Sequence, residues 1–315
     1  MTAMESEHEK AADTLRRWAL DEDLKASVLA NPVLAAEARK VARRYLAGQN
    51  AADAVAVVRA ALARGHAGSI EYAGESIRDA ALARTETGVF LDLADLIAAE
   101  RLPSTISFDL SHLGALVDPA LGLAHARELA AATGERGIGL MISAEASDRT
   151  DLVLDTYDAL AAEHPHVGVT LQARLHRTAA DLERVLDRPG RVRLVKGAFR
   201  ESEEIAYRRD SPELSSAYQQ LASRVLAAEH PLTVATHDAV LINALMTEHG
   251  ERVREPDVEF EMLLGLGTEL LDDLRERGHR TREYVIFGDE WWLYVLNRLA
   301  EHPERVITAL ADLRG

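Results

Sequence analysis

The sequence contains no cysteine and is poor in basic residues, with 52 acidic side chains against 36 lysines and arginines and a formal net charge of -16. The absence of cysteine excludes disulfides, thiolate metal sites and cysteine nucleophiles, and it fits either redox compartment. The negative charge repels phosphate backbones and anionic lipid surfaces. We therefore expect a small molecule as the partner and no nucleic acid.

Long apolar runs are also missing. No stretch approaches the roughly 20 residues that span a bilayer, and the opening MTAMESEHEKAADTLRRWAL lacks the layout of a signal peptide. We expect no transmembrane segment and a cytoplasmic location, with peripheral attachment to a membrane left open. The chain does have 47% hydrophobic residues among 315, enough for one large core or two modest ones.

Residues 1–66 differ in composition and in hydrophobic pattern from the rest of the chain. They are rich in Ala, Leu, Glu and Arg and lack strand-like alternation, which predicts an N-terminal helical arm. Over residues 67–315, short β-rich runs alternate with stretches long enough for a helix. The runs are SIEYA (69–73), TISFDL (105–110), GIGLMI (137–142), HVGVTLQ (166–172), VRLVKG (192–197), LTVATH (232–237), VEFEML (258–263) and REYVIFG (282–288).

These strand and helix units predict the fold of residues 67–315. Eight units over about 250 residues indicate an α/β domain, a distorted (β/α)8 barrel of the TIM type. Helical crossovers make the strands parallel. A doubly wound sheet stays open as the alternative, although no G-x-G-x-x-G fingerprint follows the early strands.

Polar residues gather where the expected strands end, which in a barrel is the face that carries the chemistry. The fifth strand ends in Lys196-Gly197-Ala198, a charge next to a turn that lets a flat or phosphate-bearing ligand approach the backbone. In the alternative interpretation, Lys196 and Arg193 only pair with neighbouring acids. The histidines lack the spacing of a helical zinc site, so no metal is expected. The strand ends are Glu71 and Glu75, Asp109 with His112, Ser143 with Glu145, Gln172, Lys196, Thr236 with His237 and Asp238, Glu261, and Tyr284.

The segment GDEWWLYVLNRLAEHPE (288–304) predicts a last helix directly after the eighth strand. Asp289 is placed to cap this helix behind Gly288. The edge of the helix beside its apolar stripe either leans over the barrel mouth, where it presents an arginine to an anion, or faces solvent. The stripe consists of Trp292, Val295, Leu296 and Leu299, and the edge of Tyr294, Asn297, Arg298 and Glu301.

Five motifs, RLVKGAFRE, VTLQARLHRT, VATHD, VEFEMLLG and YVIFGDEWWLYVLNRLAE, resemble in order and spacing the proline dehydrogenases of the single-domain bacterial type. The segment 75–78 is similar to that family's first barrel loop. The resemblance implies an FAD-dependent oxidoreductase acting on CH–NH donors, with noncovalent FAD over the strand ends and hydride transfer from the carbon beside the substrate nitrogen to flavin N5. A cation beside the flavin stabilises its reduced anion, and a glycine lets the backbone reach the ring. The implied cofactor residues are Gln172, Arg193, Val195, Lys196, Gly197, Ala198, Thr236, His237 and Glu301.

The substrate positions depart from the family pattern. This chain has Asp109 where proline dehydrogenases carry a lysine, and Ser143 where they carry an aspartate. It reads Asn297-Arg298 where the family has two arginines that clamp the proline carboxylate, and Phe199 replaces a tyrosine. Such a pocket holds a carboxylate less well. We expect Arg193, Asp109 and Tyr284 to serve catalysis, and Arg298, Asn297, Ser143, Leu263 and Phe199 to bind the substrate. Asp109, at the end of the second strand, either binds a cationic group or accepts a proton, or it only pairs with Arg298 or Arg78.

Four functions stay open from the sequence. The first is an FAD-dependent dehydrogenase in amino acid metabolism that oxidises the C–N bond of a proline-like or modified amine or imino acid. The second is an authentic L-proline dehydrogenase that gives pyrroline-5-carboxylate. The third is a flavin-binding protein without dehydrogenase turnover, and the fourth is a non-redox barrel, such as an aldolase, that uses Lys196 in a Schiff base. The residues do not specify the electron acceptor, whether quinone, oxygen or a carrier protein.

Overall fold

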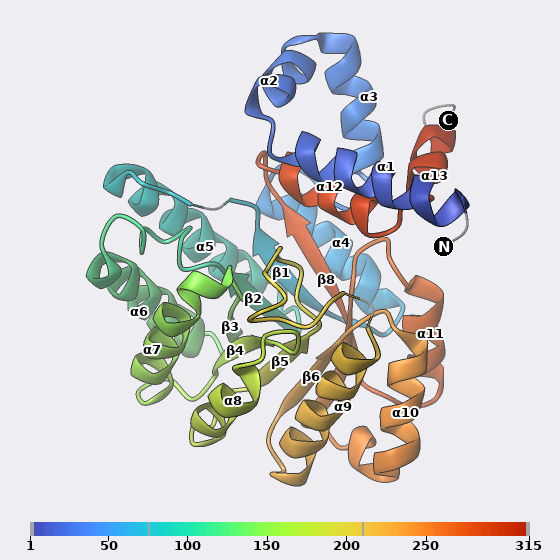
Figure 1. The fold of residues 1–315 in the computed structure, drawn as a ribbon. Coiled ribbons are helices and arrows are strands. Elements are labelled where there is room, and N and C mark those ends of the chain that lie inside the picture. Colours follow the sequence, from blue (N-terminus) through green and yellow to red (C-terminus); the bar gives the residue numbers. More distant parts are fainter. Residues whose placement is uncertain (1–2, 75, 210, 313–315) are drawn as a thin grey trace.

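The computed structural model describes residues 3–74, 76–209 and 211–312 (Figure 1). An all-helical start is followed by alternating strands and helices. The first helices are α1 (Ala3–Ala19), α2 (Glu22–Ala30), α3 (Pro32–Ala42) and α4 (Ala51–Ala63). The strands are β1 (Ala67–Tyr72), β2 (Ser104–Phe108), β3 (Gly139–Ile142), β4 (Val167–Gln172), β5 (Val192–Val195), β6 (Leu232–Ala235), β7 (Val258–Leu263) and β8 (Thr281–Phe287). The later helices are α5 (Ala80–Glu100), α6 (Pro119–Glu135), α7 (Thr150–Ala161), α8 (Thr178–Leu186), α9 (Pro212–Ala227), α10 (Ala239–His249), α11 (Thr268–Glu276), α12 (Trp292–Glu301) and α13 (Arg305–Asp312).

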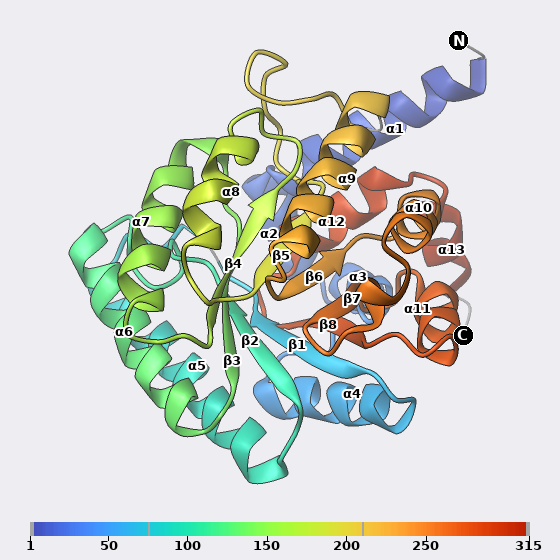
Figure 2. The same ribbon diagram turned by 90° about the horizontal axis from the view of Figure 1, so that it is seen from below.

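The strands form a closed parallel barrel in chain order, with β8 paired to β1. The predicted (β/α)8 barrel is therefore confirmed, and the doubly wound sheet was the wrong alternative. Each expected β-rich run overlaps one of the strands. Helices surround the barrel when it is viewed along its axis (Figure 2).

Local sequence signals explain where several of the outer helices begin. α4 starts with a capping box, in which Asn50 and Asp53 each bind the other's backbone N–H. α6 and α9 each have proline in the first helical position behind a side-chain cap, Asp118 and Ser211 respectively. These caps fix where the helices begin, including α6 and α9, which follow long loops after β2 and β5.

The main core lies between the strands and the surrounding helices. Fully buried side chains such as Ile70, Phe90 and Phe260 fill this layer, and α4 joins it through Val58. Gly68 on β1 allows α4 this close approach, because a Cβ there would lie 2.6 Å from Val58. The expected boundary between arm and barrel, at residues 66 and 67, falls between α4 and β1 and stays a prediction.

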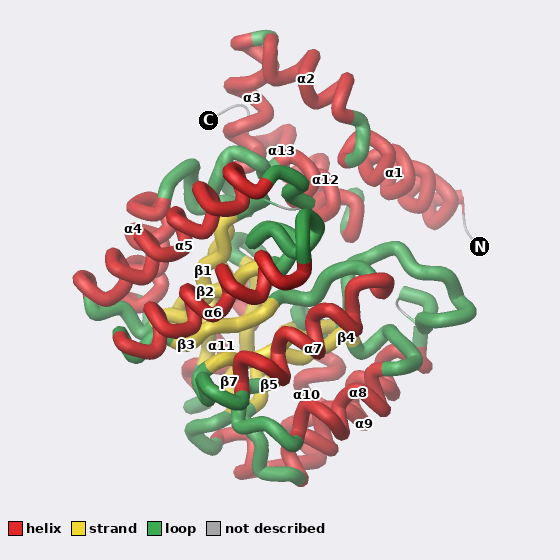
Figure 3. Tube along the Cα trace, turned by 90° about the vertical axis from the view of Figure 1, so that its left-hand side faces the viewer, coloured by secondary structure: helices red, strands yellow, loops and turns green. Residues whose placement is uncertain are grey.

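A second core joins the two ends of the chain. Helices α1–α3 lie beside α12 and α13, and α12 runs along α1 (Figures 1 and 3). Val295 and Leu299 of the predicted stripe are buried here, and the Trp292 indole donates to the Trp18 carbonyl at 2.8 Å. The capping role expected for Asp289 is wrong, because α12 begins only at Trp292, behind an N-cap without a side-chain hydrogen bond. Asp289 instead accepts a hydrogen bond from Gln49 at 2.5 Å.

Within the described ranges, no helix is both long enough and apolar enough to cross a bilayer.

Candidate active site at the barrel mouth

Polar side chains fill the barrel interior in layers, and the lower layer is built around Glu259. Arg282 donates to both carboxylate oxygens of Glu259, at 3.0 and 3.1 Å, and Thr233 donates at 2.8 Å. Arg191 lies 3.8 Å away. Desolvation opposes ionisation, but the two arginines outweigh it and lower the pKa of Glu259 to about 2. The lower layer is thus a closed, ionised network.

The upper layer surrounds Arg193 and lies one pleat nearer the carboxyl ends of the strands. Arg193 is buried, with Nε 2.9 Å from a Glu261 carboxylate oxygen and Nη2 donating to Ser107 at 2.8 Å. Ser69 donates to Glu261 at 2.7 Å. The Arg193 guanidinium also lies 4.9 Å from the ring centre of Tyr284, which is a cation–π contact. Two residues assigned to catalysis, Arg193 and Tyr284, are therefore in direct contact.

Glu71 lies above this layer, on the same face of β1 as Ser69 and partly exposed towards the mouth. Ser143, directly after β3, donates its hydroxyl to Glu71 at 3.0 Å. Desolvation, helped by repulsion from nearby Glu261, raises the pKa of Glu71 to about 7. The attraction of Arg193 and the hydrogen bond from Ser143 act in the opposite direction but do not outweigh it. Glu71 is thus a carboxyl that changes charge near neutral pH.

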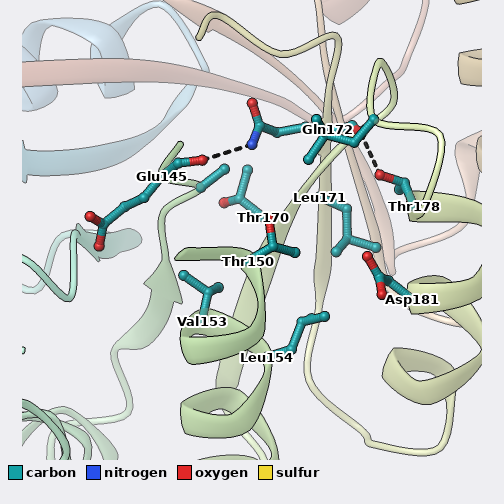
Figure 4. A pocket seen from close by; sticks show the side chains of 11 residues that line it. Glu145, Thr150, Val153, Leu154, Thr170, Leu171, Gln172, Thr178 and Asp181 are labelled. Atoms are coloured by element: carbon teal, nitrogen blue, oxygen red, sulfur yellow. Dashed lines mark hydrogen bonds between the residues drawn. The ribbon is translucent and has the colours of Figure 1, made fainter. Parts of the chain in front are cut away.

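Gln172, at the end of β4, is held from two sides (Figure 4). Its side-chain amide nitrogen donates to the Glu145 backbone carbonyl at 2.8 Å, and its backbone carbonyl accepts from the Thr178 hydroxyl at 2.6 Å. Its amide oxygen points away from Glu145 and, in the described part of the chain, this buried atom has no hydrogen-bond partner. A cavity of about 20 Å³ lies behind Gln172, room for a water molecule and not for a ligand.

The turn after β5 lies next to this amide oxygen. Gly197 has a φ of +111°, and a Cβ there would lie 2.8 Å from the Arg174 side chain and 3.1 Å from the Gln172 amide oxygen. Lys196 donates to Asp238 at 2.7 Å, with both side chains 26% exposed. Arg193 and Lys196 thus both have carboxylate partners, as the alternative interpretation required, but the buried Arg193 is not at a solvated rim.

His237, after β6, supports the neighbouring strand. Its Nε2 accepts the backbone N–H of Leu263 at 3.1 Å, which requires an unprotonated Nε2. Desolvation and the nearby charge of Arg298 keep the pKa of His237 below its usual range. Thr236 accepts the N–H of Asp238 at 3.2 Å. These contacts fix the ends of β6 and β7 relative to each other.

Helix α12 brings its polar edge to this region. Arg298 forms an ion pair with Glu301 at 2.7 Å and lies 5.4 Å from the ring centre of Tyr294. Among the described residues, the buried Arg298 Nε and Tyr294 hydroxyl have no hydrogen-bond partner. All four residues of this edge are partly buried, so the edge is not an open, solvated helix face.

The structure does not bring every predicted residue into one cluster. Asp109 follows β2 and is partly buried, and Asn297 lies on α12 next to Arg298. Phe199 and Ala198 take part through their carbonyls, which accept from Arg174 at 2.5 Å and from Arg209 respectively. Val195 ends β5. Glu75 lies outside the described residues.

Sequence reasoning missed Arg174. This buried side chain donates to the Phe199 carbonyl and twice to the Tyr207 carbonyl, at 3.0 and 3.3 Å, so it ties down the loop between β5 and α9. Its stem packs on Gly197. An arginine two residues after Gln172 in QARLHRT was the available signal, but its partners lie some 25 to 33 residues away in sequence.

Comparisons with known proteins agree with this geometry. Residues 54–302 match the family model described as proline dehydrogenase. The chain is 30% identical over 275 residues to proline dehydrogenase 1 of Bacillus subtilis subsp. natto, covering 86% of this chain and 90% of the relative. It is 31% identical over 271 residues to proline dehydrogenase of Deinococcus radiodurans, covering 84% and 86%.

A solved structure of proline utilization A from Bdellovibrio bacteriovorus has the same fold, with a TM-score of 0.76 at 19% identity. It is matched over 83% of this chain, which spans 32% of the length of that protein. The family model covers well over half of the chain and includes both β4–β6 and α12. The chain belongs to the proline dehydrogenase family, whose members are oxidoreductases that act on CH–NH donors.

Proposed function

We propose that this chain is an FAD-dependent dehydrogenase that oxidises the C–N bond of a proline-like amine or imino acid whose charge differs from that of free proline. The observation that carries the cofactor part is the buried, unpartnered Gln172 amide oxygen beside the Gly197 turn. Such an acceptor is costly unless a ligand N–H reaches it. A flat ring with an imide N–H, such as a flavin, fits both features.

The residues of the β4–β6 ends suit this cofactor. Lys196 and Arg193 would place cations beside a reduced, anionic flavin, although each already has a carboxylate partner, and Gly197 would admit the ring edge to the backbone. Val195, Ala198, Thr236, His237 and Glu301 complete the proposed cofactor set. A flavin held there would supply the hydride acceptor. The chain's own residues position the substrate and hold or move its proton.

The substrate part rests on the charges of α12 and β2. Arg298 is already paired with Glu301, and its neighbour is Asn297, so the carboxylate of free proline meets one partly neutralised guanidinium. Asp109 adds a negative charge after β2. A substrate with an extra amine, or with an esterified, amidated or carrier-bound carboxylate, suits these charges better. Ser143, Leu263, Phe199 and Tyr284 complete the proposed substrate set.

The aldolase alternative is disfavoured by the contact between Lys196 and Asp238. Hydrogen bonds from Lys196 and from the N–H of Leu241 lower the pKa of Asp238, although desolvation opposes them. The Lys196 amine is thus engaged by a carboxylate 2.7 Å away, whereas a Schiff base needs a lysine that is free to attack the substrate carbonyl. The electron acceptor and the cytoplasmic location rest on the sequence alone.

Purification and anaerobic reduction test the proposal. We expect a yellow protein that releases FAD on denaturation and whose absorbance is bleached by a member of a panel of L-proline, its methyl ester and amide, and cyclic and acyclic diamines. L-Proline should bind weakly, because loss of one buried charge-assisted contact costs about 2 to 5 kcal/mol, roughly 30-fold to several thousand-fold. The control variant Asn297→Arg adds a second guanidinium beside Arg298. It should improve the binding of L-proline and not that of the panel members without a free carboxylate.

Each outcome separates the functions. A colourless protein that takes up no FAD overturns the proposal. Ordinary saturation with L-proline establishes the authentic L-proline dehydrogenase, which the names of the Bacillus and Deinococcus relatives favour. A yellow protein that no amine bleaches is a flavin-binding protein without dehydrogenase turnover.

A further inference from the structure

An amine substrate must lose a proton, and the sequence offered Asp109, after β2, as one carboxylate that could accept it; the structure offers a second. Amines are mostly ammonium ions at neutral pH, and an ammonium nitrogen has no lone pair for a C=N bond. A group at the mouth must therefore take that proton. Such a group must lie within hydrogen-bond reach of the bound substrate and must have a lone pair that no cation or hydrogen-bond donor already occupies.

The carboxylates near the mouth differ in this respect. Glu261 is within 2.9 Å of Arg193 and accepts the Ser69 hydroxyl. Glu145 is 2.6 Å from Arg149 and accepts the N–H of Ser111. These two are occupied by cations and donors. Glu71, in contrast, has a neutral hydroxyl as its short contact and is partly exposed at the mouth.

Position also favours Glu71. Ser69, two residues earlier on the same face of β1, lies 3.4 Å from Arg193 Nη2, so Glu71 is about 7 Å further along the strand towards the mouth. The charged and titratable groups around it are Arg193 from β5, Glu261 from β7, Glu145 after β3, Tyr294 from α12 and Asp109, which lies one pleat beyond its register neighbour Ser107. Glu71 therefore lies at the carboxyl end of β1, on the mouth side of the Arg193 and Glu261 pair.

We propose that Glu71 accepts the proton of the substrate's ammonium group, with Ser143 holding its carboxyl at the mouth; the inference rests on the dehydrogenase function proposed above. An ammonium N–H bond breaks and an O–H bond forms on Glu71. The nitrogen keeps the electron pair, which forms the C=N bond when the hydride leaves the adjacent carbon. A serine hydroxyl suits both states of Glu71, because it donates to the carboxylate and accepts from the acid.

The test follows the rate constant of anaerobic flavin reduction against pH, using L-proline and whichever panel amine bleaches fastest. For the wild type we expect the rate constant to fall about tenfold per pH unit below about pH 7, where Glu71 is protonated. This fall is the acid limb of the pH profile. Glu71→Gln should lose the limb and react about 100-fold or more slowly, with little change in substrate affinity. Glu71→Asp should keep a limb.

Two serine variants form a matched pair. Ser143→Ala removes the donor to ionised Glu71, so the limb should move to higher pH. Ser69→Ala removes a donor to Glu261 and leaves the Glu71 contact in place, so the midpoint should stay. The infrared band of a protonated carboxyl, titrated in the resting enzyme, gives an independent readout that Glu71→Gln should abolish.

The outcomes distinguish this inference from the proposed function. If no amine reduces the wild-type flavin, the proposed function fails and the inference fails with it. If amines reduce the flavin and Glu71→Gln keeps both the limb and the wild-type rate, the inference alone is overturned. A limb that moves equally in Ser69→Ala and Ser143→Ala overturns the role of Ser143.

Discussion

Glu259 and Glu71 project from the inner wall of the same barrel, yet their pKa values move in opposite directions, to about 2 and about 7. Glu259 is held by a bidentate arginine, a second arginine and a threonine. Glu71 faces one arginine that already pairs with Glu261. Desolvation acts on both, so the number of available cations decides the direction.

The barrel interior thus has a structural layer around Glu259 and a reactive layer around Glu71. In the lower layer every charge has a partner, and removal of one leaves a buried, uncompensated ion. At the mouth, the Gln172 oxygen, the Arg298 Nε and the Tyr294 hydroxyl are buried without partners among the described residues. The barrel therefore places its stability below Arg193 and its binding capacity above it.

The largest expected effect is in the lower layer. Glu259→Gln leaves Arg282 buried without a counter-ion and should lower the free energy of unfolding by about 3 to 5 kcal/mol. Since the folded pKa lies below the unfolded value of 4.5, the contribution of Glu259 is present above pH 4.5 and lost as pH falls towards 2. Urea unfolding at pH 7 measures the first effect, and its repetition at pH 3 measures the second.

The control for this prediction is Glu276→Gln, which removes an exposed partner of Arg275 3.6 Å away. It should change stability by less than about 0.5 kcal/mol. If Glu259→Gln costs no more than this control, the lower layer does not have the structural role that the comparison assigns to it.

Glu71→Gln should have the opposite sign. The folded pKa of about 7 exceeds the unfolded 4.5, so the unfolded state loses its proton first and stability falls as pH rises from 4.5 to 7. Glutamine removes this penalty, which should raise stability by roughly 3 kcal/mol at pH 8 and by nothing near pH 4. Thermal unfolding of the wild type and the variant between pH 4 and pH 8 measures this difference. If the variant is less stable than the wild type at pH 8, Glu71 is a structural carboxylate like Glu259.

The barrel strands could be predicted from the sequence because buried, β-branched runs separated by helix-length stretches are a local signal. The capping role of Asp289 failed because Gln49, 240 positions away, binds it instead. Helix α13 (Arg305–Asp312) was missed, since it packs against the N-terminal helices and not the barrel. Long-range packing carries no local signature.

The candidate site divides in the same way. The strand-end residues were located because parallel strands end together, and Ser143 was found as a departure from a family motif. Its contact with Glu71 was not predicted, because a one-residue change in register or shear moves every cross-barrel pair. The pairing of Arg193 with Glu261, from β5 and β7, depends on the same geometry.

A third prediction gives Glu71 the kind of partner that Glu259 has. Ser107 is the register neighbour of Glu71, and Asp109 lies one pleat beyond it. Asp109→Lys should therefore lower the pKa of Glu71 by about one unit, worth about 1.4 kcal/mol. The reactive limb should move to lower pH, and the stability gap between pH 8 and pH 4 should narrow. Asp109→Asn, which adds no cation, should give a smaller shift, and equal shifts would contradict the placement.

The smallest effect on stability is expected at the pair of Lys196 and Asp238. Both side chains are 26% exposed, so Lys196→Ala should cost the apoprotein less than about 1 kcal/mol. Its effect on FAD should be larger, a roughly tenfold or greater loss of affinity, because a charge-assisted contact contributes about 1.5 to 3 kcal/mol.

The control Arg59→Ala removes an exposed partner of Glu100 and should leave FAD affinity unchanged. Titration of apoprotein with FAD, followed by flavin fluorescence, measures this. Unchanged FAD affinity, with a stability loss as large as that of Glu259→Gln, would make Lys196 a structural residue and move the boundary between the two layers above the β5 turn.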